Sequence, residues 1–572
     1  MAGRQEVSRC EARVYNSLVK IFPEFTPPVH QPECDRLTAL KGERVSFQVA
    51  YTINVPEGTK RGGRQVFARV EVESELAPYI TVRNVGCSPN SYPAHAVYDD
   101  NYLRTEPGLY PDLLYDLRGG IVDFSPTYWK AIWVDVYPDA GAPAGTFAVA
   151  IRFRDVDTGE LLCTARQDVA IYDVVLGEQT LIRTEWLHAD CLADYYHVPV
   201  FSEEHWRILE NFIRCANGHG VNMLLTPVFT PPLDTAVGKE RTTVQLIDVH
   251  ARDTKEGRIY TFGFEKLIRW IRLARACGIR YFEISHLFTQ WGAAFAPKVV
   301  GTLNDSGETV RLFGWESPAV GGEYTRFLNI FLPELLKVLE EEGVRENSYF
   351  HISDEPGPEH QEAYRAARNS VADALKGQTI IDALSDVAFY EQGDVPLPVC
   401  ATDHIHDFLD RGYTDVWAYY CGAQCRFVSN RYLAMPSARN RIYGLQLFKY
   451  DIKGCLHWGF NFYNAADSRF RVNPFADTAA GGSLPGGDSF LVYPGEDGRP
   501  LGSIRLMVFE EGMNDLRALN MLAARIGREK VIAMMEEDLP CEITFSQYPK
   551  SEYYLIHLRA RINAALAGEI RD

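Results

Sequence analysis

The hydrophobic and polar positions in the first third of the chain alternate in short runs. Single polar residues separate apolar ones, and Pro, Gly or Asp stands between one run and the next. This period of two is typical of antiparallel strands that bury one face. The strand candidates are 45–53, 66–72, 129–138, 145–155 and 168–176. We therefore expect an N-terminal β-sandwich over residues 1–178, with a long middle loop from Tyr92 to Phe124.

The pattern changes near Thr180, where apolar strands begin to alternate with amphipathic helices, as in parallel βαβ units. Helices are predicted over 202–220, 264–278, 324–342 and 359–376, the first with Ser202 as its N-cap. Strand candidates are 181–190, 221–228, 279–286, 348–356, 379–386, 398–403, 414–421, 454–462 and 489–495. These nine are one more than a (β/α)8 barrel needs, and we expect such a barrel over 179–502. The segment 503–572 is predicted to form a helical tail.

Composition and charge narrow the possible partners. The chain of 572 residues is 46% hydrophobic and 23% charged, as folded globular proteins are. Its net charge of −18 repels phosphate backbones and anionic lipids, so a nucleic-acid partner is not expected. The first residues show no signal peptide and no run is apolar enough to span a membrane, so we expect a cytoplasmic protein without a membrane partner. The 12 scattered cysteines are consistent with reduced thiols. The sequence pattern does not indicate an oligomeric state.

Polar and aromatic side chains follow most of the predicted barrel strands. The active site of such a barrel is built at the C-terminal ends of its strands. The residues there are Glu185, His188, Asp190, Glu283, Ser285, His286, His351, Asp354, Glu355, Asp382, Asp386, Asp403, His404, Tyr419, Tyr420, His457, Trp458 and Asn461. So many titratable and aromatic groups at one end favour an active site over a purely structural barrel.

The adjacent carboxylates Asp354 and Glu355 are the sharpest feature of this set. Neighbouring side chains of a regular strand point to opposite faces, so both reach one pocket only where a strand ends. Pro356 and Gly357 mark such an end. The alternative is one carboxylate inside and one in an outward salt bridge. Two close carboxylates raise one pKa, which suits a general acid, and glycoside hydrolysis needs such an acid beside a second stabilising group.

Several longer stretches occur together with this pair. They are TEWLHADCLADYY, FSEEHW, LTPVFTPPLDT, RYFEISHLFTQWG, FHISDEP, ATDHI, MPSARNRI and DIKGCLHWGFNFYN. Together they resemble the catalytic domain of glycoside hydrolase family 123 and the related domain of unknown function 4091. The resemblance implies a retaining β-N-acetylgalactosaminidase in which the sugar's own 2-acetamido oxygen is the nucleophile. It implies Glu355 as the general acid/base and Asp354 as the group that orients the acetamido N–H.

An acetamido sugar requires an aromatic enclosure with a tyrosine hydroxyl on its carbonyl, and Tyr419, Tyr420 and Trp458 are the candidates. Trp186, Trp291 and Trp315 are candidate platforms for an apolar sugar face, with a core or lid position as the alternative. Asp234, in a loop stiffened by paired prolines, is a candidate contact for a sugar hydroxyl. The predicted substrate-binding residues are His188, Asp190, Glu283, His286, Trp291, His351, Asp403, His404, Tyr419, Tyr420, Trp458 and Asn461. The expected partner is an oligosaccharide or glycoside, and no metal or other cofactor is expected.

Three alternatives stay open at this point. One is a glycosidase for a non-acetamido sugar, with Glu283 or Asp403 as a separate base or nucleophile. Another is a catalytically inactive carbohydrate-binding protein. The third is a metal-dependent hydrolase, since imidazole and carboxylate at strand ends are the usual zinc ligands. Its candidate ligands are His188, Asp190, His286, His351, Asp403, His404 and His406.

Overall fold

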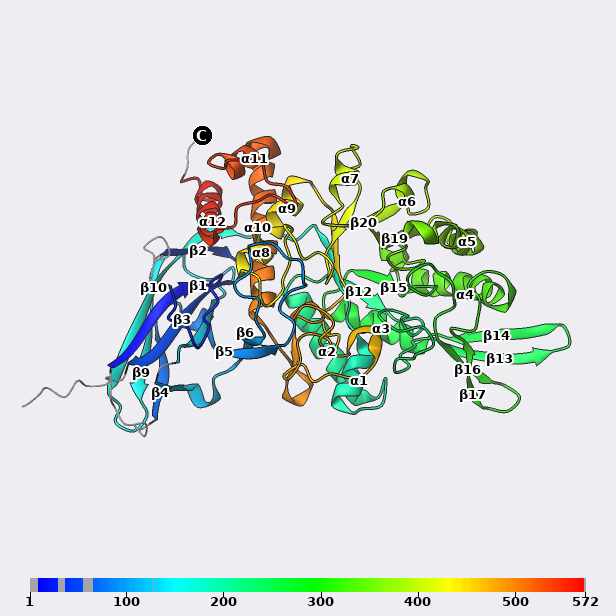
Figure 1. The fold of residues 1–572 in the computed structure, drawn as a ribbon, viewed down its shortest axis with the longest axis horizontal. Helices are drawn as coiled ribbons and strands as arrows, with labels where there is room; N and C mark the ends of the chain where they lie inside the picture. Colours follow the sequence, from blue (N-terminus) through cyan, green and yellow to red (C-terminus); the bar gives the residue numbers. More distant parts are fainter. Residues whose placement is uncertain (1–8, 29–35, 55–64, 127, 570–572) are drawn as a thin grey trace, which may run out of the picture. The chain divides into compact units, whose positions relative to one another are not determined.

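The computed structural model describes residues 9–28, 36–54, 65–126 and 128–569 (Figure 1). Contacts within the chain divide it into two compact units. The first comprises Met1–Gln179, Ser429–Lys449 and Leu501–Asp572, and the second comprises Thr180–Val428 and Tyr450–Pro500. The limits expected at residues 178 and 502 stay a prediction. The grouping of 429–449 with the first unit is a feature that the sequence pattern did not indicate.

The N-terminal part of the first unit contains two five-stranded sheets. One has the order β1(Arg9–Asn16), β3(Val45–Asn54), β8(Lys130–Val136), β5(Ile80–Asn90) and β6(Gly108–Asp116). The other has the order β2(Arg36–Lys41), β10(Leu161–Val175), β9(Gly145–Asp155), β4(Val66–Glu73) and β7(Ile121–Phe124). All pairs are antiparallel except β10 with β2. Phe47 and Val134 of the first sheet share one hydrophobic core with Phe153 and Val169 of the second.

The segment expected to be one long loop, Tyr92 to Phe124, contains two strands, so that expectation was wrong. Strand β6 lies at the edge of one sheet and β7 at the edge of the other. Pro111 occupies β6, opposite Cys87, next to a shift in register. An edge strand tolerates proline because one of its sides needs no ladder hydrogen bonds. The proline interrupts the apolar alternation, which is why the sequence pattern failed to indicate a strand.

Five helices complete the first unit among its described residues. They are α8(Ser437–Arg441), α9(Tyr443–Lys449), α10(Ile504–Ile526), α11(Arg528–Glu536) and α12(Glu552–Leu566). The Ser503 side chain caps α10 by accepting a hydrogen bond from the backbone N–H of Leu506. Helices α9 and α10 approach closely at two glycines. A Cβ on Gly444 would lie 1.9 Å from the carbonyl oxygen of Gly512, so only glycine fits there.

The second unit is built around a closed barrel of eight parallel strands, as predicted. In order they are β11(Ile182–Glu185), β12(Met223–Thr226), β15(Tyr281–Ile284), β18(Ser348–Phe350), β19(Thr379–Leu384), β20(Leu397–Ala401), β21(Trp417–Tyr419) and β22(Gly454–His457). The helices are α1(Ala189–Tyr196), α2(Glu203–Gly218), α3(Glu265–Ala276), α4(Gly322–Glu341), α5(Gln361–Val371), α6(Ala388–Glu391) and α7(His406–Leu409). Ser202 caps α2 as predicted, accepting from the N–H of His205. Met223, Leu225, Ile381 and Val399 fill the barrel interior.

Two hairpins extend the loops that follow the second and third barrel strands. They are β13(Asp248–Thr254) with β14(Gly257–Gly263), and β16(Val299–Leu303) with β17(Thr309–Phe313), and they join into one four-stranded sheet. This sheet projects from the barrel in Figure 1. The ninth strand candidate, 489–495, contributes only β23(Tyr493–Pro494), which pairs with β24(Pro500–Leu501) outside the barrel. That outcome resolves the surplus strand of the sequence pattern.

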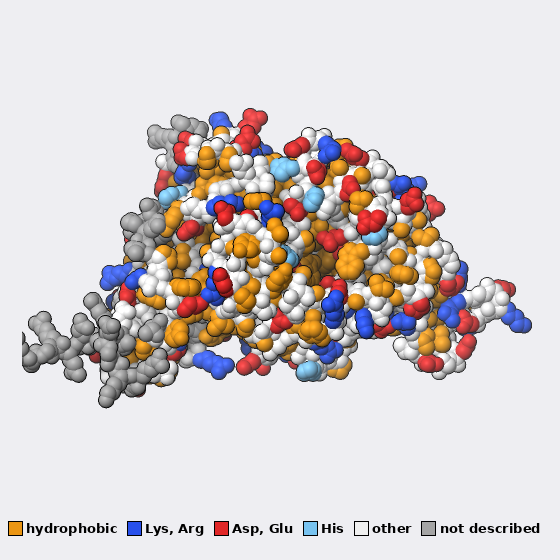
Figure 2. Space-filling view, viewed as in Figure 1, with side chains coloured by type: hydrophobic (Ala, Val, Ile, Leu, Met, Phe, Trp, Pro, Cys, Tyr) orange, Lys and Arg blue, Asp and Glu red, His pale blue; other side chains and the backbone are white. Residues whose placement is uncertain are grey.

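No helix in the described part of the chain is both long and apolar enough to cross a membrane. On the face drawn in Figure 2, Lys and Arg side chains of the described residues are interspersed with Asp and Glu.

Candidate active site

A pocket with about 810 Å3 of empty space opens within the second unit. Its walls come from the loops after the barrel strands together with the strand ends themselves. The lining residues are Trp186, Leu233, Asp234, Gln290, Trp291, Asp354, Glu355, Ala383, Tyr419, Cys421, Gly422, Ala423, Leu456, Trp458, Leu484 and Asp488. Of the predicted site residues, it therefore collects Trp291, Asp354, Glu355, Tyr419 and Trp458.

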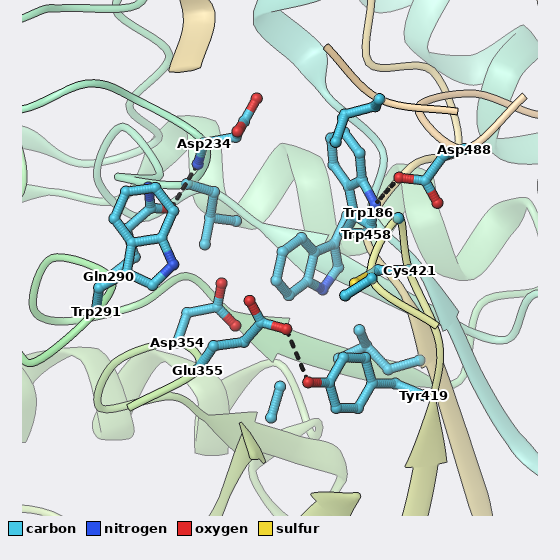
Figure 3. Close-up of a pocket in the computed structure, with 16 residues that line it drawn as sticks. Trp186, Asp234, Gln290, Trp291, Asp354, Glu355, Tyr419, Cys421, Trp458 and Asp488 are labelled. Atoms are coloured by element: carbon cyan, nitrogen blue, oxygen red, sulfur yellow. Dashed lines mark hydrogen bonds between the residues drawn. The ribbon is translucent and has the colours of Figure 1, made fainter. Parts of the chain in front are cut away.

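Asp354 and Glu355 both line this pocket, just beyond the end of β18 (Figure 3). The backbone leaves the strand geometry here, because Glu355 has a φ of +43°, in the left-handed region that only glycine adopts without strain. The backbone N–H of Trp291 donates to the carbonyl oxygen of Asp354 at 2.9 Å and so helps to fix the turn. The bend turns two adjacent side chains to the same side, as the sequence pair requires.

Both carboxyls of the pair are shifted towards their protonated forms. Burial, with the charge of Glu355, raises the pKa of Asp354 well above its usual range. Burial also raises the pKa of Glu355, although a hydrogen bond from the Tyr419 hydroxyl to Glu355 Oε1, at 2.7 Å, acts in the opposite direction. The side chains are partly exposed to the pocket, but the protein around them excludes most bulk water. These shifts favour the protonated forms of the pair, as a general acid requires.

A buried hydrogen-bonded group of Glu283, His351 and Asp382 lies beside the pair. It includes two of the predicted substrate-binding residues, Glu283 and His351. His351 Nε2 is 2.6 Å from Glu283 Oε1, and its Nδ1 is 2.9 Å from Asp382 Oδ1. Burial alone would lower the pKa of His351, but these hydrogen bonds and charges raise it to about 10. These contacts favour the protonated form of His351 between Glu283 and Asp382, although burial raises the pKa of Asp382 as well. The positive charge of His351 favours the ionised form of Asp354.

Buried carboxylates also orient the two tryptophans that form the apolar wall. The indole N–H of Trp186 donates to Glu283 Oε1 at 2.8 Å, and that of Trp458 donates to Asp488 Oδ2 at 3.0 Å. Each hydrogen bond fixes the indole ring and satisfies its only donor. Glu283 thus supports the pocket wall, and it is not among the lining residues.

His188, Asp190 and Asn461 form a second buried network, outside the set of lining residues. Arg241 makes two hydrogen bonds to Asp190, at 2.9 and 2.8 Å, and one to His188 Nδ1 at 3.0 Å. Asn461 accepts from the backbone N–H of His188 and donates to its carbonyl oxygen. Arg241 also donates to the carbonyl oxygen of Leu233, so the network holds a loop that lines the pocket.

Asp403, His404 and Tyr420 also lie outside the lining set. Asp403 Oδ1 is 2.9 Å from His404 Nδ1 and accepts from Gln424 Nε2 at 3.1 Å. The ring of Tyr420 is buried and packs edge-on against His457. Their predicted roles in sugar binding stay predictions.

One group of described residues has the spacing of a metal site. Ligand atoms of His286, His351 and Asp382 lie within 4.8 Å of one another. However, the two imidazole rings stack with centroids 4.1 Å apart and planes at 22°, so their in-plane lone pairs run side by side instead of converging. Both ring nitrogens of His351 already face carboxylates. Burial and the charge of His351 keep the pKa of His286 well below its usual value. The group fits a neutral imidazole stacked on an imidazolium better than a metal centre.

Several lining residues were not predicted. Gln290, Cys421 and Asp488 come from irregular loops after β15, β21 and β22, which have no periodic pattern. Two other lining residues, Trp186 and Asp234, are candidates from the sequence, the first as a sugar platform and the second as a contact for a sugar hydroxyl. For the others, the only available signal was their place after a predicted strand.

Comparisons with known structures place the fold. A family 123 glycoside hydrolase from Clostridium perfringens, studied for glycolipid glycan hydrolysis, is 13% identical, with a TM-score of 0.71 and 98% of each chain covered. Bacteroides uniformis β-glucuronidase 2 is 11% identical over 85% of this chain and 49% of its own, with a TM-score of only 0.30. At such identities the first likeness shows a shared fold alone, and the second is too distant to carry an argument. Among proteins with curated functions, none matches the chain.

The sequence itself carries the assignment to a family. The profile described as Glycoside hydrolase 123, catalytic domain, matches residues 186–522, which is more than half of the chain. The match spans all the lining residues of the pocket. The chain therefore belongs to glycoside hydrolase family 123, and it is a glycosidase whose substrate is a glycan.

Proposed function

We propose that the chain removes terminal β-linked N-acetylhexosamine, in the manner of a β-N-acetylgalactosaminidase, by a substrate-assisted mechanism that retains the anomeric configuration. The observation that carries the proposal is the placement of Asp354 and Glu355 together in one pocket, with the Tyr419 hydroxyl on Glu355. These groups supply an acid, a carboxylate and a hydroxyl donor, which are the three that acetamido participation needs.

Glu355 is the general acid/base in this proposal, and Asp354 binds the acetamido N–H. Hydrogen bonding to a carboxylate favours its ionised form. An acetamide N–H that donates to Asp354 therefore lowers its pKa and leaves the shared proton on Glu355, beside the leaving oxygen. As the acetamido oxygen attacks the anomeric carbon, the Asp354 carboxylate offsets the positive charge of the forming oxazolinium ring.

Tyr419 can serve both the acid and the acetamido group. In the structure its hydroxyl donates to Glu355 Oε1 and favours the carboxylate form. When a sugar enters, the hydroxyl turns to the acetamide carbonyl. Loss of that hydrogen bond raises the pKa of Glu355 and makes it a better proton donor. Of the three candidates for the acetamide enclosure, Tyr419 and Trp458 line the pocket, and we assign the carbonyl contact to Tyr419.

Trp186 and Trp458 present fixed indole rings that suit the apolar face of a pyranose. Trp291 is 44% exposed and lies across the pocket from them in Figure 3. We assign it to the leaving-group side, where the rest of the glycan continues towards solvent.

The alternative with a separate nucleophile has lost its first candidate. Glu283 receives hydrogen bonds from Thr184 and Trp186 and pairs with His351, and it is fully buried. It has no access to an anomeric carbon in the pocket. This arrangement favours the acetamido group as the nucleophile.

We extend the proposal to the N-terminal sheets and the C-terminal helices. We take the two N-terminal sheets, which share one core, as the expected β-sandwich, and α10, α11 and α12 as the helical tail. We also propose a structural role for the sheets, none of whose described residues lines the pocket.

The test uses a thiazoline analogue of the oxazolinium intermediate and an NMR assay of the first-formed product anomer. Substrate assistance predicts tight competitive inhibition, because the analogue resembles the charged cyclic intermediate, and it predicts a β-anomeric product. An α-anomeric product, or no inhibition by the thiazoline, would exclude the mechanism.

A further inference from the structure

The charged side chains that line the pocket are all acidic. They are Asp234, Asp354, Glu355 and Asp488. Of the described residues in the lining, none is Lys, Arg or His. A pocket that binds a sulfate, phosphate or uronate group normally offers it arginine or lysine. The lining therefore has the charge pattern of a site for uncharged or cationic sugars.

Two buried basic side chains beside the pocket are paired with other carboxyl groups. Arg241 forms a bidentate pair with Asp190 and donates also to the Leu233 carbonyl oxygen. His351 stands between Glu283 and Asp382. Neither side chain lines the pocket. Arg469, whose charge also acts on Asp234, is paired with Asp467 and does not line the pocket either.

Asp234 is held in place by the loop that brings it to the pocket. Its backbone N–H donates to Gln290 Oε1 at 2.6 Å, and its carbonyl oxygen accepts from the Ser468 hydroxyl at 2.7 Å. Its φ of +42° is in the left-handed region, so the loop holds it in an unusual conformation. Figure 3 draws its carboxylate apart from those of Asp354 and Glu355.

The charge of Asp234 follows from its surroundings. Burial raises its pKa to about 6, while the Asp467 backbone N–H and the charge of Arg241 act in the opposite direction. The carboxyl is therefore ionised at neutral pH. A second anion brought next to it in this poorly hydrated pocket would be repelled strongly, because the local dielectric constant is far below that of water.

We propose that this pocket excludes anionic sugars, and that the Asp234 carboxylate is a specificity-determining group that does so. Uronic acids and sulfated amino sugars carry such a charge. The substrate class is then a terminal sugar without sulfate or carboxylate. The inference rests on the proposed function, which makes this pocket the sugar site.

The test compares two esters of 4-nitrophenyl 2-acetamido-2-deoxy-β-galactoside: the 6-O-sulfate and the uncharged 6-O-methylsulfonate, which has similar bulk. The ratio of their kcat/KM values isolates charge from size. We expect the wild type to prefer the uncharged ester by about 100-fold. Asp234→Asn should reduce that ratio by about tenfold, whereas Asp305→Asn, on the β16–β17 turn, should leave it unchanged. Equal use of both esters by the wild type, or an unchanged ratio in Asp234→Asn, would overturn the proposal.

A binding measurement separates this inference from the proposed function. Calorimetry compares a cationic iminosugar with its analogue that carries a carboxylate at C6, and it requires no turnover. If acetamido substrates are inert, the proposed function fails, yet tighter binding of the cationic ligand would still support anion exclusion. Tighter binding of the carboxylate analogue would overturn it. Binding of neither ligand would also overturn it, since the pocket would then not recognise a sugar.

Discussion

The first unit and the pocket of the second unit treat buried charge in opposite ways. In the first unit, buried carboxylates are matched by arginines: Arg505 binds Asp112 through two hydrogen bonds of 2.9 Å, and Arg439 binds Asp99 at 2.8 and 2.7 Å. In the second unit, the carboxylates that line the pocket have no cationic side chain among the described lining residues. Similar groups thus stand in two different electrostatic settings.

The difference separates charges that hold a fold from charges that perform chemistry. An arginine beside a buried carboxylate keeps it ionised and hydrogen-bonded. A buried carboxylate beside another carboxylate is shifted towards its protonated form instead, and the pKa values of Asp354 and Glu355 are both raised. The second arrangement lowers the stability of the fold, and it favours a group that can donate a proton.

The largest effect is expected from removing the acid of the pocket. Glu355→Gln should lower kcat/KM by about 10²–10⁴-fold on a substrate with a poor leaving group, because proton donation is lost. A more reactive leaving group should suffer less. Steady-state kinetics checks this, with circular dichroism to confirm folding and Glu362→Gln, an exposed carboxyl on α5, as the matched control. Activity within a few-fold of wild type would remove Glu355 from its role.

The next effect is on stability and concerns the first unit. Arg441 donates to Asp515 at 2.7 and 3.0 Å and to Glu511 at 2.8 Å. Arg441→Met should lower the free energy of unfolding by about 3–5 kcal/mol, because buried Glu511 loses its arginine and buried Asp515 keeps only Arg559. Chemical denaturation measures this, and Arg214→Met, on the exposed face of α2, should not shift the midpoint. A large loss of kcat/KM in the folded Arg441 variant would contradict the distinction between structural charges in the first unit and catalytic charges in the pocket.

A smaller, pH-dependent effect should come from Glu511. Burial raises its pKa to about 7, while the charge of Arg441 acts in the opposite direction. Between the usual carboxyl pKa and about pH 7, the folded state then binds more protons than the unfolded state. The contribution of Glu511 to the free energy of unfolding should be greatest at acidic pH. It should fall by about 1–3 kcal/mol as the pH rises to 7. Denaturation of Glu511→Gln from pH 5 to 8 should show a flatter profile than the wild type, and an identical profile would contradict this.

The smallest expected effect is that of a chelator. The stacked rings of His286 and His351 do not direct lone pairs to one point, so dialysis against a strong chelator should leave kcat/KM unchanged. Elemental analysis of the dialysed protein accompanies the assay. Loss of activity that zinc or manganese restores would favour the metal-dependent alternative.

Periodicity was enough to predict the barrel and its fourth strand, because parallel strands alternate with long amphipathic helices. The strand-ending Pro356 then indicated where Asp354 and Glu355 would turn together. The edge strand with Pro111 escaped because proline breaks the alternation that identifies a strand.

The candidate site was harder to predict than the fold. Some residues at strand ends line the pocket, and others are buried behind its wall. Strand length and twist decide which of the two applies to a given residue. His351 and Glu283 are buried behind the wall, where they orient pocket residues. Asp488 and Gln290 line the pocket from irregular loops, whose course depends on tertiary contacts and leaves no periodic trace in the sequence.

The central claim is that the pocket's acids act together with the substrate's acetamido group, and one ratio tests it most directly. Wild type and Asp354→Asn are compared on 4-nitrophenyl β-galactosides that carry either a 2-acetamido or a 2-hydroxy group. We predict that the wild type prefers the acetamido substrate by about 100-fold or more in kcat/KM, as expected for an oriented intramolecular nucleophile. Asp354→Asn should lose most of that preference. Efficient turnover of the 2-hydroxy substrate by the wild type, with no change of preference in Asp354→Asn, would contradict the account.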